Sequence, residues 1–243
     1  MLRVVVKNNR KKYRFLLVFA FLFCGCEIDY EDGERLLILG TAGDESFEPF
    51  PELPIDATAY DSGFLRGSGR IGISTTATDG TYSITTLSPK GSANIAVEIN
   101  NPLHQDYNPN YSSYDIRGVN ELPLKNSTYS VPDISISKLV NVTLQINRVM
   151  NMADSLIYTY GYKSPMQTLS FQQRTQPGPS APFLDGRSGV MTPGESIQNI
   201  SIPDLSEGDT LRLTYQLRNN SIPEYGETRL IFDDEQDAYV FEF

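Results

Sequence analysis

The sequence predicts an all-β protein made of two tandem antiparallel β-sandwiches that follow a short amino-terminal leader. Three observations predict it. Apolar and polar residues alternate along nearly every hydrophobic stretch of the body of the chain, no window of about 12 residues keeps the helical period of about 3.6, and short strands are separated by turn-forming residues. A hydrophobic content of 40% in 243 residues is ordinary for a chain that forms globular cores.

The alternation assigns an inner and an outer face to individual strands, because successive side chains of a strand point to opposite sides of the sheet. The predicted inner faces carry Ala93, Ile95, Val97 and Ile99 in ANIAVEIN, Val140, Val142, Leu144 and Ile146 in LVNVTLQIN, and Leu211, Leu213, Tyr215 and Leu217 in DTLRLTYQLR. The residues between them are predicted to lie on the opposite face, Glu98 and Asn100 among them.

One turn stands out in the first half of the chain, in ISTTATDGTYSITTL. The pair Asp79-Gly80 supplies the positive φ that a tight hairpin needs, so the sequence predicts a hairpin there.

The segments LLILGTAGDES, LPIDATAYD, TTATDGTYSITTL, ANIAVEIN and YSVPDISISK follow one another over about residues 33–137. Their order resembles a carboxypeptidase-regulatory-like, or transthyretin-like, domain. The matching positions are Gly40, Pro54, Thr78, Asp79, Gly80 and Tyr82. A glycine that the family places after Pro54 is absent, and Asp56 lies near that position. The resemblance implies a seven-stranded sandwich over residues 35–137 that does no chemistry, with Asp79 and Gly80 in structural roles.

The second half, residues 138–243, contains seven further candidate strands. They are LVNVTLQIN, SLIYTYGY, MQTLSFQQ, SIQNISI, TLRLTYQL, TRLIF and AYVFEF. This number of short strands over about 100 residues is typical of an immunoglobulin-like sandwich. Two domains of this size can each bury a modest core, so neither needs a metal or a disulfide to fold.

The first 25 residues differ in composition from the rest of the chain. They contain six basic residues and no acidic one, and an uncharged run of 12 residues, Phe15 to Cys26, follows Arg14. This order is typical of a secretory signal, and the run is shorter than the roughly 20 residues that span a bilayer. The sequence therefore predicts a signal peptide over residues 1–25.

The run ends in FCGC, which resembles the lipobox of bacterial lipoproteins, in particular the Phe-rich signals of Bacteroidetes, although Phe23 replaces the usual leucine and Cys24 a small residue. The resemblance implies cleavage between Gly25 and Cys26 and acylation of Cys26. A disulfide is disfavoured because cysteines two residues apart do not easily reach its geometry. A metal site would need ligands from a chain with one histidine and no further cysteine.

An acidic segment over residues 26–34 follows the cysteine. On physical grounds it is a solvated tether; it also resembles the acidic export signals of surface-exposed Bacteroidetes lipoproteins, which implies that the protein faces the cell exterior. Without the first 25 residues, 14 basic and 30 acidic residues remain, a net charge of −16. This charge excludes nucleic acid as a partner.

Candidates for chemistry are few. His104 is the only histidine, and no GxSxG motif accompanies it, so it is interpreted as a surface-loop residue and a Ser/His/Asp mechanism is not predicted. The acidic run at 233–237 is interpreted as a hairpin loop, because glycosidases hold two acids at a fixed separation in a cleft and EF-hands space their ligands differently. We therefore predict no enzyme activity, no cofactor and no metal site.

Two long loops are the candidate binding segments, since binding residues concentrate on loops held by rigid sandwiches. Residues 101–129 carry Tyr107, Tyr111 and Tyr114, which either form an exposed binding face or cover the edge of the core. Residues 172–196 form a second loop, too long for a simple connector. Ser155 and Thr210 lie in Asp-Ser-Leu and Asp-Thr-Leu tripeptides that resemble the O-glycosylation sequence of exported Bacteroidetes proteins.

These observations lead to one expected function and one alternative. We expect a non-catalytic outer-membrane lipoprotein, held by lipid on Cys26 and facing the exterior, that acts as an accessory or scaffolding subunit of a larger envelope assembly. A TonB-dependent transporter or another β-barrel machine is the expected partner. The alternative is a glycan-binding or adhesive surface module that acts through Tyr107, Tyr111 and Tyr114.

Overall fold

A computed structural model describes residues 30–46, 48–60, 68–90, 93–149, 155–171, 184–218, 223–231 and 238–243. The predicted signal peptide, Gly25, Cys26 and the acidic run at 233–237 lie outside this part. The strands are β1 (Tyr30–Gly43), β2 (Pro54–Tyr60), β3 (Ser68–Thr75), β4 (Thr81–Pro89), β5 (Asn94–Ile99), β6 (Ser113–Arg117), β7 (Thr128–Ser130), β8 (Ile134–Ser135), β9 (Leu139–Asn147), β10 (Ser155–Lys163), β11 (Met166–Ser170), β12 (Leu184–Met191), β13 (Ile197–Ser206), β14 (Thr210–Arg218), β15 (Glu224–Ile231) and β16 (Ala238–Glu242).

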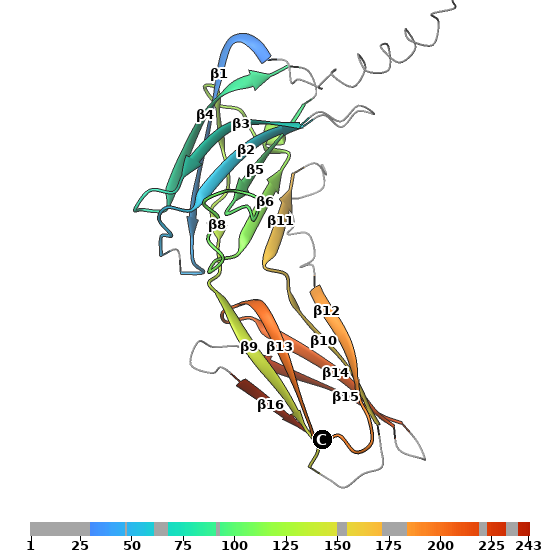
Figure 1. Ribbon diagram of the computed structural model, residues 1–243. Helices are drawn as coiled ribbons and strands as arrows, with labels where there is room; N and C mark the ends of the chain where they lie inside the picture. The colour runs from blue at the N-terminus through green and yellow to red at the C-terminus, as the bar shows by residue number, and fades with distance from the viewer. Residues whose placement is uncertain are drawn as a thin grey trace, which may run out of the picture.

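The chain is all-β, as predicted, and forms two sandwiches that lie end to end (Figure 1). Among the described residues, the one helical element is the short 3-10 helix η1 (Val119–Glu121). Most strand pairs are antiparallel, whereas β1–β7, β1–β8, β6–β11 and β9–β16 are parallel. The start of β1 lies at the end of the first sandwich that is farthest from the second sandwich (Figure 1).

The first sandwich encloses an isoleucine-rich core. One sheet has the order β4-β1-β7, with β8 also paired to β1, and the other has the order β11-β6-β5-β2-β3. The core lies between them and includes the fully buried Ile38, Ile55, Ile99 and Ile116. The predicted inner face of 93–100 is confirmed for Ile95, Val97 and Ile99, which are all buried.

The second sandwich encloses a core in which three tyrosines of one strand take part. Its sheets have the orders β12-β10-β14-β15 and β13-β9-β16. Tyr158, Tyr160 and Tyr162 alternate along β10 and are buried together with leucines and isoleucines of β9 and β14. The predicted inner faces of β9 and β14 are confirmed: Val142, Leu144, Ile146, Leu211 and Leu213 are buried, and Val140, Tyr215 and Leu217 pack against them.

Strand β11 belongs to the first sandwich, although the sequence places it in the second half of the chain. Met166–Ser170 pairs in parallel with β6, and backbone hydrogen bonds from Ser113 N–H to Pro165 O (2.8 Å) and from Phe171 N–H to Arg117 O (3.0 Å) extend the pairing at both ends. The predicted domain boundary between residues 137 and 138 therefore does not hold for β11, because the chain returns to the first sandwich after β10.

The predicted hairpin at Asp79-Gly80 is a turn between sheets. Gly80 has the expected positive φ of 75°, and the Asp79 carboxylate accepts hydrogen bonds from the backbone N–H (3.1 Å) and the hydroxyl (2.7 Å) of Thr81. However, β3 and β4 belong to opposite sheets. The hairpin prediction was wrong because the same residues serve any reversal of the chain that needs a positive φ.

Both predicted long loops contain strands. Residues 113–117 form β6 within the first predicted loop, β7 begins at its end with residue 128, and residues 184–191 form β12 within the second. LDGRSGVM has two glycines and little apolar alternation, so nothing local predicts a strand there. The segment is a strand because it pairs with β10 along eight residues, from Lys163↔Leu184 to Leu156↔Met191.

Three tyrosine rings lie directly over glycines of a neighbouring strand. The pairs are Tyr82 over Gly40, Tyr158 over Gly189 and Tyr215 over Gly226, and each pair is in register across its ladder. A methyl group on any of these glycines would overlap the ring of the tyrosine. The rings cover backbone that would otherwise be bare, as aromatic residues do for sheet glycines in designed proteins.

We expect Gly189→Ala to lower the free energy of unfolding by about 1–3 kcal/mol, the usual cost of overpacking a core. Tyr158 is only 3% exposed, so its ring cannot move into solvent to make room. Urea unfolding of the variant and of Ser188→Ala, an exposed neighbour on the same strand, tests this. Similar values for the two variants would contradict the role of the tyrosine–glycine contact.

Candidate functional site

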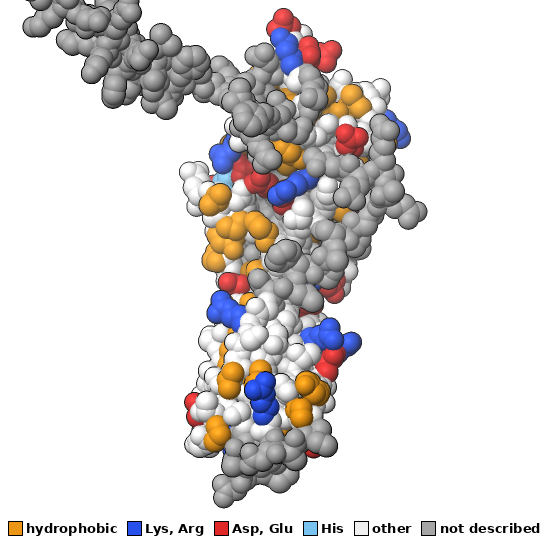
Figure 2. Space-filling view, turned by 90° about the vertical axis from the view of Figure 1, so that its right-hand side faces the viewer, with side chains coloured by type: hydrophobic (Ala, Val, Ile, Leu, Met, Phe, Trp, Pro, Cys, Tyr) orange, Lys and Arg blue, Asp and Glu red, His pale blue; other side chains and the backbone are white. Residues whose placement is uncertain are grey.

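Three carboxylates form a row across the outer face of the first sandwich. Asp56 on β2 is in register with Glu98 on β5, and Glu98 is in register with Asp115 on β6. Residues in register project to the same side of a sheet, and the neighbours of these three in sequence, such as Ile55, Val97 and Ile116, face the core. We call Asp56, Glu98 and Asp115 the acidic row. Figure 2 shows acidic and basic side chains gathered side by side on the first sandwich.

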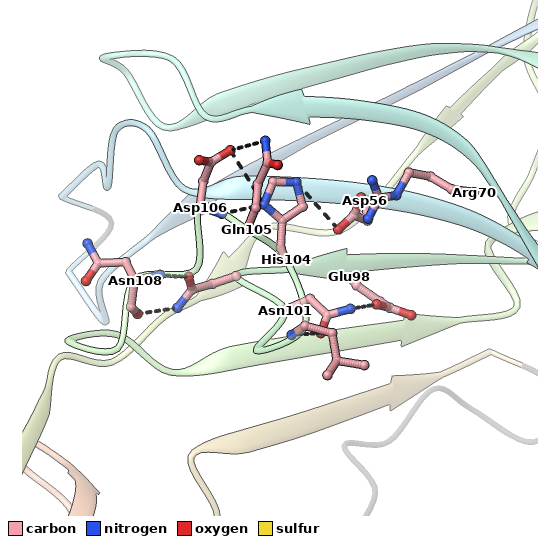
Figure 3. Close-up of polar contacts among 10 residues, drawn as sticks. Asp56, Arg70, Glu98, Asn101, His104, Gln105, Asp106 and Asn108 are labelled. Atoms are coloured by element: carbon pink, nitrogen blue, oxygen red, sulfur yellow. Dashed lines mark hydrogen bonds and ion pairs between the residues drawn. The ribbon is translucent and has the colours of Figure 1, made fainter.

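Each member of the acidic row has a polar partner. Arg70 on β3 places Nε 2.8 Å from Asp56 Oδ1, an ion pair without the alignment of a hydrogen bond. Arg117 Nε donates a hydrogen bond of 2.6 Å to Asp115 Oδ2, and this bond is the main reason that the pKa of Arg117 is raised. Asn101 Nδ2 donates a hydrogen bond to Glu98 Oε2 (Figure 3). The two arginines balance two of the three negative charges.

Asp56 is the most deeply buried member, with a side chain only 3% exposed. Its second oxygen, Oδ2, has no hydrogen-bond partner and lies 4.0 Å from Nε2 of His104 (Figure 3). Burial of a carboxylate costs free energy unless it is paired, so Arg70 and His104 are what makes an aspartate tolerable in this strand.

His104 covers the acidic row from the loop that follows β5. The backbone N–H of Asp106 donates a hydrogen bond of 3.1 Å to His104 Nδ1, so Nε2 carries the proton of the neutral ring and points toward Asp56 (Figure 3). The side chain is 9% exposed. Interpreting His104 as a surface-loop residue was therefore wrong, since its ring closes over Asp56.

Asn100 holds this loop in shape. It is fully buried at a positive φ of 52°, and its Nδ2 lies 2.9 Å from the carbonyl oxygens of both Asn108 and Tyr111. Its Oδ1 accepts a hydrogen bond of 2.9 Å from Asn108 N–H, and its backbone oxygen accepts one of 2.6 Å from the Ser113 hydroxyl. The side-chain amide of Asn100 thus forms hydrogen bonds with backbone groups on both sides of the loop. The alternation had placed Asn100 on the outer face, whereas the residue is fully buried.

The three tyrosines proposed as a binding face do not form one exposed surface. Tyr111 packs against the first core and against Phe50, with ring centroids 4.6 Å apart, and Tyr114 on β6 packs against the same core. Tyr107 is half-buried, hydrogen-bonds to Ser113, and its pKa is raised mainly by burial. The placement of Tyr111 and Tyr114 is that of the alternative interpretation, in which the rings cover the edge of the core.

Ionisation of the central glutamate is opposed by its surroundings. Partial burial, followed by the negative charges of Asp115 and Asp56, raises the pKa of Glu98, and the hydrogen bond from Asn101 opposes this rise. Within the described part of the chain no group of three or more His, Cys, Asp or Glu side chains is arranged to hold a metal ion. The acidic row is thus a polar network that anchors the 101–112 loop on the sheet.

The remaining predicted sites fall elsewhere. Ser155 begins β10 and the exposed Thr210 begins β14, at opposite ends of the second sandwich. In the part of the chain that the structure describes, no helix is long and apolar enough to cross a membrane. Sequence reasoning missed Asp56, Arg70, Asp115 and Arg117 as site residues; the one available signal was the charged Asp56 inside the mostly apolar strand β2.

Comparisons with known proteins give no family. No protein-family model and no curated protein matches the chain. Among solved structures, it is similar to the Bacillus anthracis TIE protein (10% identity, TM-score 0.29, 86% of this chain and 33% of that one). It is also similar to a streptococcal ancillary pilin (14%, 0.31, 87% and 63%) and to a putative cell adhesion protein from Bacteroides ovatus (11%, 0.29, 88% and 92%). The chain thus spans less than two thirds of the first two, and TM-scores of this size assign neither a family nor a function.

We expect Asn100→Ala to lower the free energy of unfolding by about 3 kcal/mol, since it leaves buried backbone groups unpaired and places alanine at a positive φ. Asn100→Gly should cost about 1 kcal/mol less, because glycine adopts that φ freely. Urea unfolding, with amide hydrogen exchange over residues 101–112, checks both. Equal losses for the two variants would show that the backbone conformation is not strained.

We expect Glu98→Gln to stabilise the fold at neutral pH, with a gain over the wild type that grows from about pH 3 to about pH 7. The raised pKa means that the folded state holds the Glu98 proton more tightly than the unfolded state. Its contribution to stability is therefore greatest at low pH and falls as the pH rises through the folded pKa. Thermal unfolding across this range, with the exposed Glu121→Gln as control, measures the effect; a gain that does not depend on pH would rule out this explanation.

Proposed function

We propose that this chain is a non-catalytic lipoprotein of the outer membrane that displays its second sandwich away from the cell surface. The observation that carries the proposal is the position of the start of β1. Cys26 lies four residues before Tyr30, and four extended residues span at most about 14 Å. Because β1 begins at the far end of the first sandwich (Figure 1), a lipid on Cys26 would hold that end at the membrane and direct the second sandwich outward.

The connection between the sandwiches supports such a display role. Leu139 N–H donates a hydrogen bond of 2.7 Å to Asn110 O, Glu207 N–H donates one of 2.9 Å to Lys138 O, and the side chains of Lys138 and Glu207 approach to 3.6 Å. Together with β11, these contacts join the two sandwiches by more than a flexible linker. A spacer that presents a distal domain benefits from this stiffness.

The surroundings of His104 support a non-catalytic role. Both ring nitrogens face carboxylate or backbone groups, Nδ1 toward Asp106 and Nε2 toward Asp56, and the ring itself is almost covered. A general base needs a ring nitrogen directed at a nucleophile or a substrate. The expected partnership with a TonB-dependent transporter or another β-barrel assembly stays a prediction, as does the resemblance to carboxypeptidase-regulatory-like domains.

We expect an alkyne fatty acid fed to producing cells to label the wild type and Cys24→Ala equally and to leave Cys26→Ala unlabelled. The reason is that only Cys26 remains after cleavage behind Gly25. In-gel fluorescence after click coupling reads the result, and protease treatment of intact cells should then degrade the labelled protein. Labelling of Cys26→Ala would refute the anchor, and full protection from protease would place the protein on the periplasmic side.

A further inference from the structure

The outer face of the sheet β12-β10-β14-β15 carries a shallow groove. Its volume is about 530 Å³, and its side chains come from three neighbouring strands: Ile157, Thr159, Thr214, Gln216, Tyr225 and Glu227. We call it the distal groove. β14 starts near the first sandwich, just after the contact of Glu207 with Lys138. The groove lies toward the other end of β14, where β15 begins with Glu224 and Tyr225, and is therefore distal to the first sandwich.

Strand register arranges the groove in two rows. Val190, Ile157, Gln216 and Tyr225 are neighbours across the four strands, and Ser188, Thr159, Thr214 and Glu227 form the next row. The first row is apolar and aromatic apart from Gln216, whereas the second consists of hydroxyl groups and one carboxylate. The groove therefore offers a flat apolar surface directly beside a line of hydrogen-bonding groups.

Tyr225 is the exposed aromatic residue of the groove. It is 75% exposed, whereas the core-facing tyrosines of β10 are buried. Gln216 Nε2 lies 3.1 Å from the Tyr225 hydroxyl and donates a hydrogen bond to it, which restrains the ring on the edge strand. A restrained, solvent-exposed aromatic ring offers a flat apolar face at little entropic cost to a ligand that stacks on it.

The carboxylate in the groove lining, Glu227, is paired with two arginines. Glu227 receives a hydrogen bond of 2.7 Å from Arg212, and Nε of Arg229 lies 3.3 Å from its other oxygen. The hydrogen bond from Arg212 is the main cause of the lowered pKa of Glu227, so this carboxylate stays ionised and paired. Glu227, the charged side chain in the lining of the groove, is therefore already paired, so a neutral ligand can bind there without separating an ion pair.

A protein partner fits this face less well. A stable protein interface buries roughly 800 Å² on each partner around an apolar centre. The large apolar side chains most open to solvent on this face are Tyr225, Ile231 and Val190, at 75%, 67% and 51% exposed. They do not form one patch: Gln216 and the half-buried Ile157 separate Val190 from Tyr225, and Glu227 and Arg229 separate Tyr225 from Ile231 along β15. Hydroxyl groups and paired charges occupy the rest of the face.

We propose that the distal groove binds a neutral oligosaccharide, with Tyr225 stacked on a sugar ring and Gln216, Thr159 and Thr214 as hydrogen-bonding partners of its hydroxyl groups. The inference rests on the proposed function in that the displayed sandwich is the one that carries the groove. It moves the glycan-binding surface from the tyrosines of the 101–129 segment to the second sandwich.

The test measures binding of the mature full-length chain, purified in detergent, to immobilised oligosaccharides of β-glucan, xylan, mannan and chitin, with polygalacturonate as the charged comparison. We expect saturable binding to at least one neutral class and weaker binding to polygalacturonate. Tyr225→Ala should weaken the binding at least tenfold, and Tyr225→Phe should stay within about threefold because the stacking face remains.

Ile231→Ala is the matched control, since Ile231 lies on the same strand and the same face, is 67% exposed and is outside the groove. It should bind as the wild type does. Binding to none of the neutral panel, or equal binding by Tyr225→Ala and the wild type, would overturn the proposal. Purified protein is used, so a negative result leaves the fatty-acid labelling outcome untouched, and failure of the lipid anchor would not alter the groove.

Discussion

The pairing of β11 with β6 is the constraint on which the arrangement of the molecule depends. A chain that only passed once from the first sandwich to the second would leave them joined by the few residues between β8 and β9. Because β10 continues into β11, five residues of the second half become an edge strand of the first sandwich, and backbone hydrogen bonds at Ser113 and Phe171 fix both ends. The orientation of the second sandwich relative to the first is then set by the pairing of β11 with β6, and side-chain contacts such as Lys138–Glu207 contribute less.

Local pattern was sufficient where a strand has one apolar face. The alternation in β5, β9 and β14 identified the large core-facing side chains correctly, because burial of one face acts on each strand separately. The pairing partner of each strand could not be predicted in this way, because pairing depends on residues far apart in the chain. This is why β12 was taken for loop, why β11 was assigned to the wrong sandwich, and why the turn at Asp79-Gly80 was read as a hairpin although it joins opposite sheets.

The polar site was invisible to sequence reasoning for the same reason. Asp56, Glu98 and Asp115 are about 40 and 17 residues apart and become neighbours only through the register of three strands. Asn100 was placed on an outer face by alternation, yet the chain leaves the strand there at a positive φ and its amide turns inward to bind the loop. Tyrosine content alone could not distinguish the core-packed Tyr111 from the exposed Tyr225, because the same ring serves both environments.

The direction of the strands next to β1 has a mechanical consequence. β1 runs from the far end of the first sandwich toward the second, and β7 and β8 lie beside it in parallel, with β8 leading directly into β9. A tensile load applied between the start of β1 and the second sandwich would pull these parallel strands in opposite directions along their length. Their hydrogen bonds lie across the direction of pull and would be loaded together in shear, not opened one after another. The first sandwich is therefore built to bear force along the axis on which the two sandwiches lie.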